Sequence, residues 1–197
     1  FRRGQRAGRS EFGQTFHARG ADIRYHLEVD FLDAARGAKR NVTMPDGNGI
    51  EITIPPGVKD GQTLRLRGKG GPGHGESPPG DALVTISVRP HAFFSRDGND
   101  IEMDLPITFD EAVLGLKVEV PTVSGSVTMT IPKGASSGRR LRLKGKGVQD
   151  ATGKAGDQLV QLRIVLPDSI GPEMEALAQQ WRDLSDLDPR KAMEKKT

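Results

Sequence analysis

The sequence contains two copies of one pattern, offset by 78 residues and, after a one-residue deletion, by 77. Asp22 and Ile23 recur as Asp100 and Ile101, and alternating apolar residues then stay in register through both copies. The matched leucines and glycines include Leu27 and Leu105, Gly37 and Gly115, Gly68 and Gly145. Because these residues coincide in a fixed order, we expect one backbone built twice, as two tandem modules.

The composition limits what the modules can be. Each module of about 75 residues is near the size at which one hydrophobic core is barely sufficient, and only 35% of the residues are hydrophobic. No apolar run approaches the roughly 18 residues of a membrane span, so we expect no membrane partner. The chain has no cysteine, which excludes disulfides and thiolate metal sites and fits a cytoplasmic location. It begins with Phe1 rather than methionine, so we expect a fragment.

The positive charge is concentrated at the N-terminus. The net charge is +3, but residues 1–20 hold five arginines and one glutamate, a charge of +4, which leaves −1 for the rest of the chain. These residues show no helical or alternating period, so we expect a flexible Gly/Phe/Arg leader. Phosphate contacts supply most of the affinity for nucleic acid, so the body of the chain is expected to bind it poorly.

Within each copy the apolar residues follow strand periodicity. Residues 23–29 place Ile23, Tyr25, Leu27 and Val29 on one face, and residues 31–37 predict a short helix that ends at Gly37. Further strands are expected over 41–44, 50–54, 63–67 and 82–88, with a turn at 45–49 and a loop at 70–80. The fold class is therefore mostly β, with two tandem, mostly antiparallel β-sandwich modules over 21–95 and 96–170.

Residues 171–197 lie outside the repeat and predict an amphipathic helix that starts at Pro172. Its apolar stripe consists of Met174, Leu177, Trp181 and Leu184. The stripe either packs on the second module or contacts a second chain. We favour dimerisation, because the only tryptophan lies on an element that neither repeat needs.

The sequence contains no catalytic, cofactor or metal motif in the surrounding sequence that such a motif needs. Residues 68–73 match the dinucleotide-binding glycine pattern, but Pro72 and the following Gly75 forbid the helix that this motif needs. The four histidines lack metal-ligand spacing, and no serine lies in a Gly-x-Ser-x-Gly context. Asp110 and Glu111 are interpreted as helix-start residues. We therefore expect no catalytic residues, no cofactor and no metal, and a protein that is not an enzyme.

The repeats resemble a known family. The run DLPITFDEAVLGLKVEVPTVSGSVTMTIPKGASSGRRLRLKGKG, followed by GDQLVQLRIVLP, resembles the second C-terminal module of DnaJ-type co-chaperones. The run DIRYHLEVDFLDAARGAKRNV resembles the first, and the likeness covers roughly residues 20–185. The J domain with its His-Pro-Asp triplet and the cysteine-rich zinc module are both absent from this sequence, and residues 45–49 lie where the zinc module would be inserted. This points to the zinc-free class, which includes curved-DNA-binding-protein-like members.

The resemblance implies a client-binding groove in the first module. Carried over by position, the groove would be lined by apolar residues with one arginine at the rim: Tyr25, Leu27, Val42, Met44 and Phe94, with Arg40. The adaptable methionine suits varied client side chains. The alternative is that these residues are ordinary core. The equivalent residues of the second module are also apolar (Met103, Leu105, Val118, Val120), so the choice of module stays open.

Two functions of different class follow. The first is a V-shaped homodimer that binds unfolded polypeptide, added along a strand, for a DnaK-type chaperone. The acidic C-terminal tail of that chaperone is a second expected ligand, through Arg40. The alternative is binding of curved DNA, for which the arginines of the leader are the only evident means.

Overall fold

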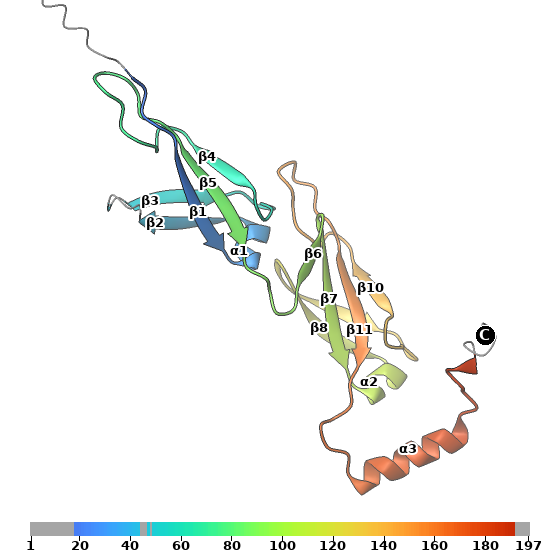
Figure 1. Cartoon of the computed structure of the whole chain (residues 1–197). Coiled ribbons are helices and arrows are strands. Elements are labelled where there is room, and N and C mark those ends of the chain that lie inside the picture. Colours follow the sequence, from blue (N-terminus) through green and yellow to red (C-terminus); the bar gives the residue numbers. More distant parts are fainter. Residues whose placement is uncertain (1–17, 44–46, 48, 192–197) are drawn as a thin grey trace, which may run out of the picture.

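The computed structural model describes residues 18–43, 47 and 49–191. Its strands form two similar groups joined by a short linker, and a helix extends from the far end of the second group (Figure 1). The predicted leader up to His17, and Met44 of the predicted groove, lie outside the described residues.

The first module contains five strands and one short helix. They are β1 (Ile23–Val29), α1 (Phe31–Arg36), β2 (Ala38–Thr43), β3 (Gly49–Ile54), β4 (Thr63–Leu66) and β5 (Ala82–Val88). One sheet has the order β1-β5-β4, and the second sheet is the hairpin of β2 and β3. Apolar residues from both sheets meet between them in one buried cluster around Val29, Ile52, Ile54, Val84 and Ile86.

The second module repeats this order and adds one strand. Its elements are β6 (Ser95–Asp97), β7 (Asp100–Ile107), α2 (Phe109–Leu114), β8 (Leu116–Thr122), β9 (Gly125–Ile131), β10 (Arg140–Leu143) and β11 (Gln158–Ile164). The larger sheet has the order β10-β11-β7-β6, and β8 and β9 form the hairpin. The predicted mostly β fold with short helices is confirmed.

The centre of each larger sheet differs from the antiparallel arrangement expected from the sequence. β1 pairs with β5 in parallel, and β7 pairs with β11 in parallel, whereas the other strand pairs are antiparallel. In each module the hairpin and one further strand lie, in sequence, between the two parallel strands. The chain can therefore run along the second parallel strand in the same direction as along the first. A strand's own alternation of apolar residues contains no information about the direction of its neighbour.

The short helices end and begin as their sequences predict. Gly37 terminates α1 with φ of 79°, and a Cβ there would lie 2.9 Å from the nitrogen of Pro56, so glycine is required both by conformation and by space. At α2 the backbone N–H of Thr108 donates to the carboxylate of Glu111 at 2.9 Å, one half of a capping box.

The two modules share packing across their junction. Ala35 of α1 is buried in the core of the second module, and Phe31 and Leu32 pack against that core. The guanidinium of Arg96 in β6 donates to the carbonyls of Gly57 and Val58, each at 2.9 Å. Arg36, in α1 of the first module, donates to the carbonyl of Val123 in the second module. These contacts fix the end of the first module against the second.

The final helix, α3 (Pro172–Leu184), starts with proline as predicted and has no buried residue. The indole of Trp181 meets the ring of Phe109 edge-on, with centroids 4.9 Å apart. No helix among the described residues is long and apolar enough to cross a membrane.

Candidate peptide-binding site

Three of the predicted groove residues lie in the first module. Tyr25 and Leu27 on β1 and Val42 on β2 are half-buried, and all three pack against the same buried cluster. On β1 they alternate with Arg24 and His26, which point to the opposite, exposed face of the strand. The two strand edges therefore present a partly accessible apolar strip between the two sheets of the first module.

Phe94 is not brought to this strip. It follows the linker from β5, is 7% exposed and belongs to the buried cluster of the second module. Its ring stacks on His91, with centroids 4.8 Å apart, and on Phe31, at 6.2 Å. Two depressions lie beside Phe94 rather than at the strip: one of about 560 Å³ over the outer face of β7 and β11, and one of about 640 Å³ at the junction of the modules.

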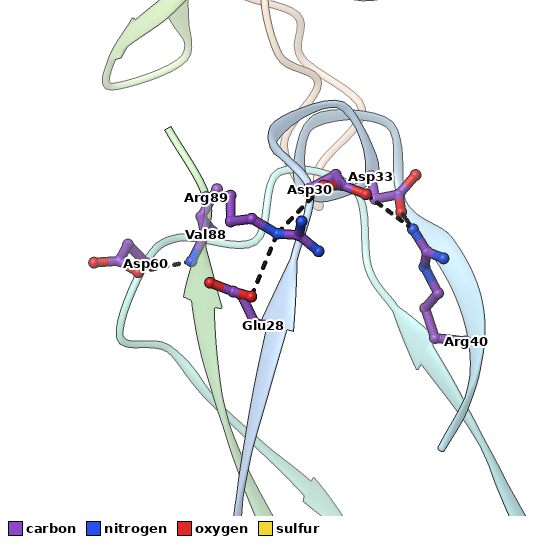
Figure 2. Close-up of polar contacts among 7 residues, drawn as sticks. All are labelled: Glu28, Asp30, Asp33, Arg40, Asp60, Val88 and Arg89. Atoms are coloured by element: carbon purple, nitrogen blue, oxygen red, sulfur yellow. Dashed lines mark hydrogen bonds and ion pairs between the residues drawn. The ribbon is translucent and has the colours of Figure 1, made fainter. Parts of the chain in front are cut away.

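Arg40, the predicted rim residue, is engaged in ion pairs (Figure 2). Its guanidinium lies 3.3 Å from the carboxylate of Asp30 and also contacts Asp33 in α1. The side chain remains 47% exposed, so the pairs are in contact with solvent and contribute little to stability. An incoming carboxylate would compete with Asp30 and Asp33 for this arginine.

Further charged contacts surround the end of β1 (Figure 2). Arg89 lies 3.4 Å from the carboxylate of Glu28 and 3.5 Å from that of Asp30. Asp60 accepts a hydrogen bond of 2.8 Å from the backbone N–H of Val88. The end of the strip nearest the junction is thus bordered by groups of both signs.

The equivalent positions of the second module are closed. Met103, Leu105 and Val120 are 7%, 8% and 0% exposed, and only Val118 is half-buried. Their counterparts Tyr25, Leu27 and Val42 are all half-buried. The repeated sequence therefore has an accessible apolar strip in one module and a sealed core in the other.

Two elements that the first module lacks at these positions accompany the burial: α1, whose Ala35 lies in this core, and the strand β6, which the sequence pattern does not predict. β6 pairs with β7, with Ser95 opposite Glu102, and covers the edge that β1 leaves without a strand partner in the described residues. The sequence feature that indicates β6 is the Asp97-Gly98 dipeptide, which is frequent in hairpin turns. Gly98 adopts a positive φ of 60°. β6 is too short for its own periodicity to be recognised.

A second duplicated feature lies at the opposite end of the larger sheets. Asp81, nearly fully buried, accepts from the backbone N–H of Gly68 at 2.8 Å and from Arg65 at 2.7 Å. The Gly68 bond, followed by the Arg65 bond, lowers the pKa of Asp81 to about 2. In the second module the N–H of Gly145 and then Arg142 lower the pKa of Asp157. These carboxylates hold a loop in place, and their duplication marks them as part of the scaffold.

Metal-ligating side chains do not gather in the described part of the chain, where no group of three or more histidines, aspartates or glutamates is arranged to hold an ion. The half-buried apolar strip of the first module therefore has, among the features described, the chemical character of a binding site.

The fold defines the chain as a duplicated β-sandwich protein, and in its first module β1 has no strand partner on its outer side among the described residues. Residues 23–167 match the family described as the DnaJ C terminal domain. A protein named Curved DNA-binding protein from Coxiella burnetii (strain RSA 493 / Nine Mile phase I) is 37% identical over 193 residues, covering 91% of this chain and 61% of that protein.

Two proteins named Chaperone protein DnaJ are also similar. The one from Bacillus velezensis is 44% identical over 137 residues, 69% of this chain and 36% of its own length. The one from Ruminiclostridium cellulolyticum is 40% identical over 171 residues, 81% of this chain and 45% of its own length. The chain belongs to the DnaJ C-terminal domain family. It spans less than two thirds of the length of these relatives, none of which bears the name of an enzyme.

Proposed function

We propose that this chain is the client-binding part of a co-chaperone that holds unfolded polypeptide for a DnaK-type chaperone. One observation carries the proposal: the apolar strip is half-buried in the first module and sealed in the second. Family membership supports a chaperone role in binding clients. The strip that Tyr25, Leu27 and Val42 form would take the apolar side chains of the client.

The strip is suited to weak, broad binding. It is shallow and apolar, and it is bordered by charged side chains such as Arg40 and Arg89 that keep their contact with water. Burial of one client side chain of leucine size is worth about 1.5–3 kcal/mol before the cost of ordering the client. A single strip would therefore hold a segment loosely, and two strips in a dimer would add avidity.

We assign dimerisation to α3. The stripe residues Met174, Leu177, Trp181 and Leu184 are 49%, 63%, 48% and 87% exposed, and the helix buries no residue within its own chain. Trp181 touches Phe109, which orients the helix against the second module but leaves most of the stripe uncovered. A second copy can cover it with the same stripe, as a two-fold symmetric contact requires.

We also propose that the chain binds the acidic C-terminal tail of a DnaK-type partner. Arg40 lies two residues before Val42 on β2, and a tail carboxylate would replace Asp30 or Asp33 as its partner. The exchange is feasible because these ion pairs are exposed and therefore weak. We also expect a cytoplasmic location, where such a partner would act.

DNA binding is the second candidate, favoured by the name of the Coxiella burnetii relative, Curved DNA-binding protein. The five arginines of residues 1–20 would supply the phosphate contacts, because the rest of the chain carries a net charge of −1.

The proposed function is tested by titrating reduced, carboxymethylated α-lactalbumin, a permanently unfolded client, against the full chain and two variants. Leu27→Ser should weaken binding about fivefold or more, as expected for the loss of one buried apolar contact. Leu105→Ser, the matched change, should affect binding less. Thermal unfolding is measured alongside, because serine in a true core would cost several kcal/mol of folding free energy. Equal losses in binding from both changes would contradict the assignment to the first module.

A further inference from the structure

The junction between the modules contains a depression of about 640 Å³ that residues of both modules line. It lies beside the linker that joins β5 to β6 (Figure 1). Residues of α1 and Val58 border it from the first module, and Phe94 and Ser95 border it from the second. Small-ligand sites are clefts of about 300–1,000 Å³ that occur preferentially at the interfaces between domains. The depression therefore has the size and the position of a small-ligand site.

Three aromatic rings border this depression. The ring of His91 stacks on that of Phe94, with centroids 4.8 Å apart, and is tilted against that of Phe31 at 5.7 Å. The Nδ1 atom of His91 accepts from the backbone N–H groups of Phe93 and Phe94, at 3.2 and 3.3 Å, which fixes the orientation of the imidazole. Phe31 and His91 are half-buried, so part of each ring stays accessible. A flat aromatic ligand can extend this group, because aromatic rings prefer offset-stacked and edge-to-face neighbours.

The rim of the depression carries more positive than negative charge. Asp60 has a role in the scaffold, because its carboxylate accepts from the N–H of Val88 at 2.8 Å. In the second module the hydroxyl of Ser137 accepts from the equivalent N–H of Ile164, also at 2.8 Å. The excess of positive charge favours a ligand with an anionic group. Three cationic side chains and one carboxylate line the rim: Lys59, Arg89, Arg96 and Asp60.

Lys59 is the cation that a ligand can reach. The guanidinium of Arg96 donates to three backbone carbonyls. Arg89 lies 3.4 Å from the carboxylate of Glu28 and 3.5 Å from that of Asp30 (Figure 2). Lys59 is exposed, and its ammonium forms no ion pair in the part of the chain that the structure describes. An anionic ligand can therefore pair with Lys59 without displacing a carboxylate.

The repeat shows that the fold does not require these cations. Lys59 corresponds to Ser136 in the second module, and Arg89 corresponds to Val165. The aromatic position is repeated, because Phe31 corresponds to Phe109. The cations thus belong to the junction and not to the duplicated scaffold, which indicates a role other than folding.

We propose that the junction depression binds a small aromatic carboxylate, with its ring against Phe31 and His91 and its carboxylate at Lys59. Both modules line the depression, so a bound ligand adds contacts between them and stiffens the junction. The ligand thereby limits how far the first module can move relative to the second. The site lies apart from the apolar strip and does not depend on the binding of clients.

The ligand side is tested by titrating 2-naphthoate against the full chain, followed by NMR spectroscopy. We expect saturable binding that shifts the amide resonances of Val58, His91 and Phe94. Naphthalen-2-ylmethylammonium, which has the same ring and the opposite charge, should bind about fivefold more weakly or worse.

The protein side is tested with two matched pairs of variants. Lys59→Glu should weaken the binding of naphthoate by about fivefold or more. Lys69→Glu, the same change at an exposed lysine of the first module outside the depression, should leave binding unchanged. Phe31→Leu should weaken binding by about threefold or more, as expected for the loss of an aromatic pair, whereas Phe109→Leu should not.

Two further measurements accompany these titrations. Thermal unfolding verifies that each variant folds, and Lys59→Glu, at an exposed position, tests the site even if Phe31→Leu fails to fold. Limited proteolysis measures the junction itself. Saturating naphthoate should slow cleavage of the linker in the parent chain and leave the rate unchanged in Lys59→Glu.

The outcomes are distinct from those of the client-binding test. Equal binding of the two naphthalene ligands, or equal effects of Lys59→Glu and Lys69→Glu, would overturn the assignment of the carboxylate to Lys59. Shifted resonances in α3 or in the strip, with none at the junction, would overturn the site. Absence of saturable binding up to the solubility limit of naphthoate would overturn the proposal as a whole and leave the client-binding function unaffected.

Discussion

The carboxylate of Asp22 accepts a hydrogen bond of 2.7 Å from the backbone N–H of Asp81, 59 residues later in the chain. The second module repeats this bond between Asp100 and Asp157, also at 2.7 Å. In both copies the bond ties the start of the first strand of the repeat to the start of its parallel partner. The duplicated aspartates therefore set the register of the parallel pair on which the strip and the strand edge depend.

We expect acid to weaken the first module through Asp81. Its pKa in the folded chain is about 2, below the ordinary value of about 3.9 expected when the chain is unfolded. The stabilisation is thus complete above the unfolded-state pKa and is lost as the pH falls toward the folded-state pKa. The free energy of unfolding, measured in urea at a series of pH values, should fall between about pH 4 and pH 2. Asp81→Asn should be less stable at pH 7 and lose less over this window, whereas Asp168→Asn, at an exposed position, should keep the slope of the parent.

The junction between the modules should depend on Arg96. Its guanidinium donates to the carbonyls of Gly57, Val58 and Gly98, and burial lowers its pKa. We expect Arg96→Met to lower the free energy of unfolding by about 1–3 kcal/mol, because carbonyls facing the junction lose a charged donor. Urea unfolding measures this loss, and faster proteolysis of the linker would report a loosened junction. Arg163→Met, on the exposed face of β11, is the control, and equal effects from both changes would contradict a special role for Arg96.

Dimerisation should depend on the stripe of α3. Leu177→Asp places a charge in the centre of the stripe and should shift the chain to a monomer, as should truncation after Gly171, with both modules still folded. Gln179→Asp introduces the same charge on the opposite side of the helix and should remain dimeric. Light scattering over a concentration series measures the outcome. A truncated chain that is still a dimer would place the interface elsewhere.

Any binding of DNA should reside in the N-terminal segment. Deletion of residues 1–17 removes Arg2, Arg3, Arg6 and Arg9 but retains the ion pair of Arg19 with Asp81. We expect the affinity for duplex DNA and its dependence on salt concentration both to decrease, because counterion release scales with the number of cationic contacts. Unchanged affinity and an unchanged salt slope would show that the folded body binds DNA despite its net charge.

Local sequence patterns determined the elements of this protein and their repetition. The matched glycines and leucines predicted one fold built twice, Gly37 predicted the end of α1, and Pro172 predicted the start of α3. Each of these features depends on a few consecutive residues whose conformational preferences are intrinsic, so they can be recognised without knowledge of distant neighbours.

Only the tertiary structure decided how the elements face one another. Alternating apolar residues on β1 and β7 are compatible with either direction of the neighbouring strand, and they do not show that β6 covers one edge while the other stays open. The sequence likewise placed Phe94 with Tyr25, whereas Phe94, the residue before β6, lies in the core of the second module. Open and sealed strips thus arise from nearly the same local pattern, because burial depends on what lies across the strand edge and not on the strand itself.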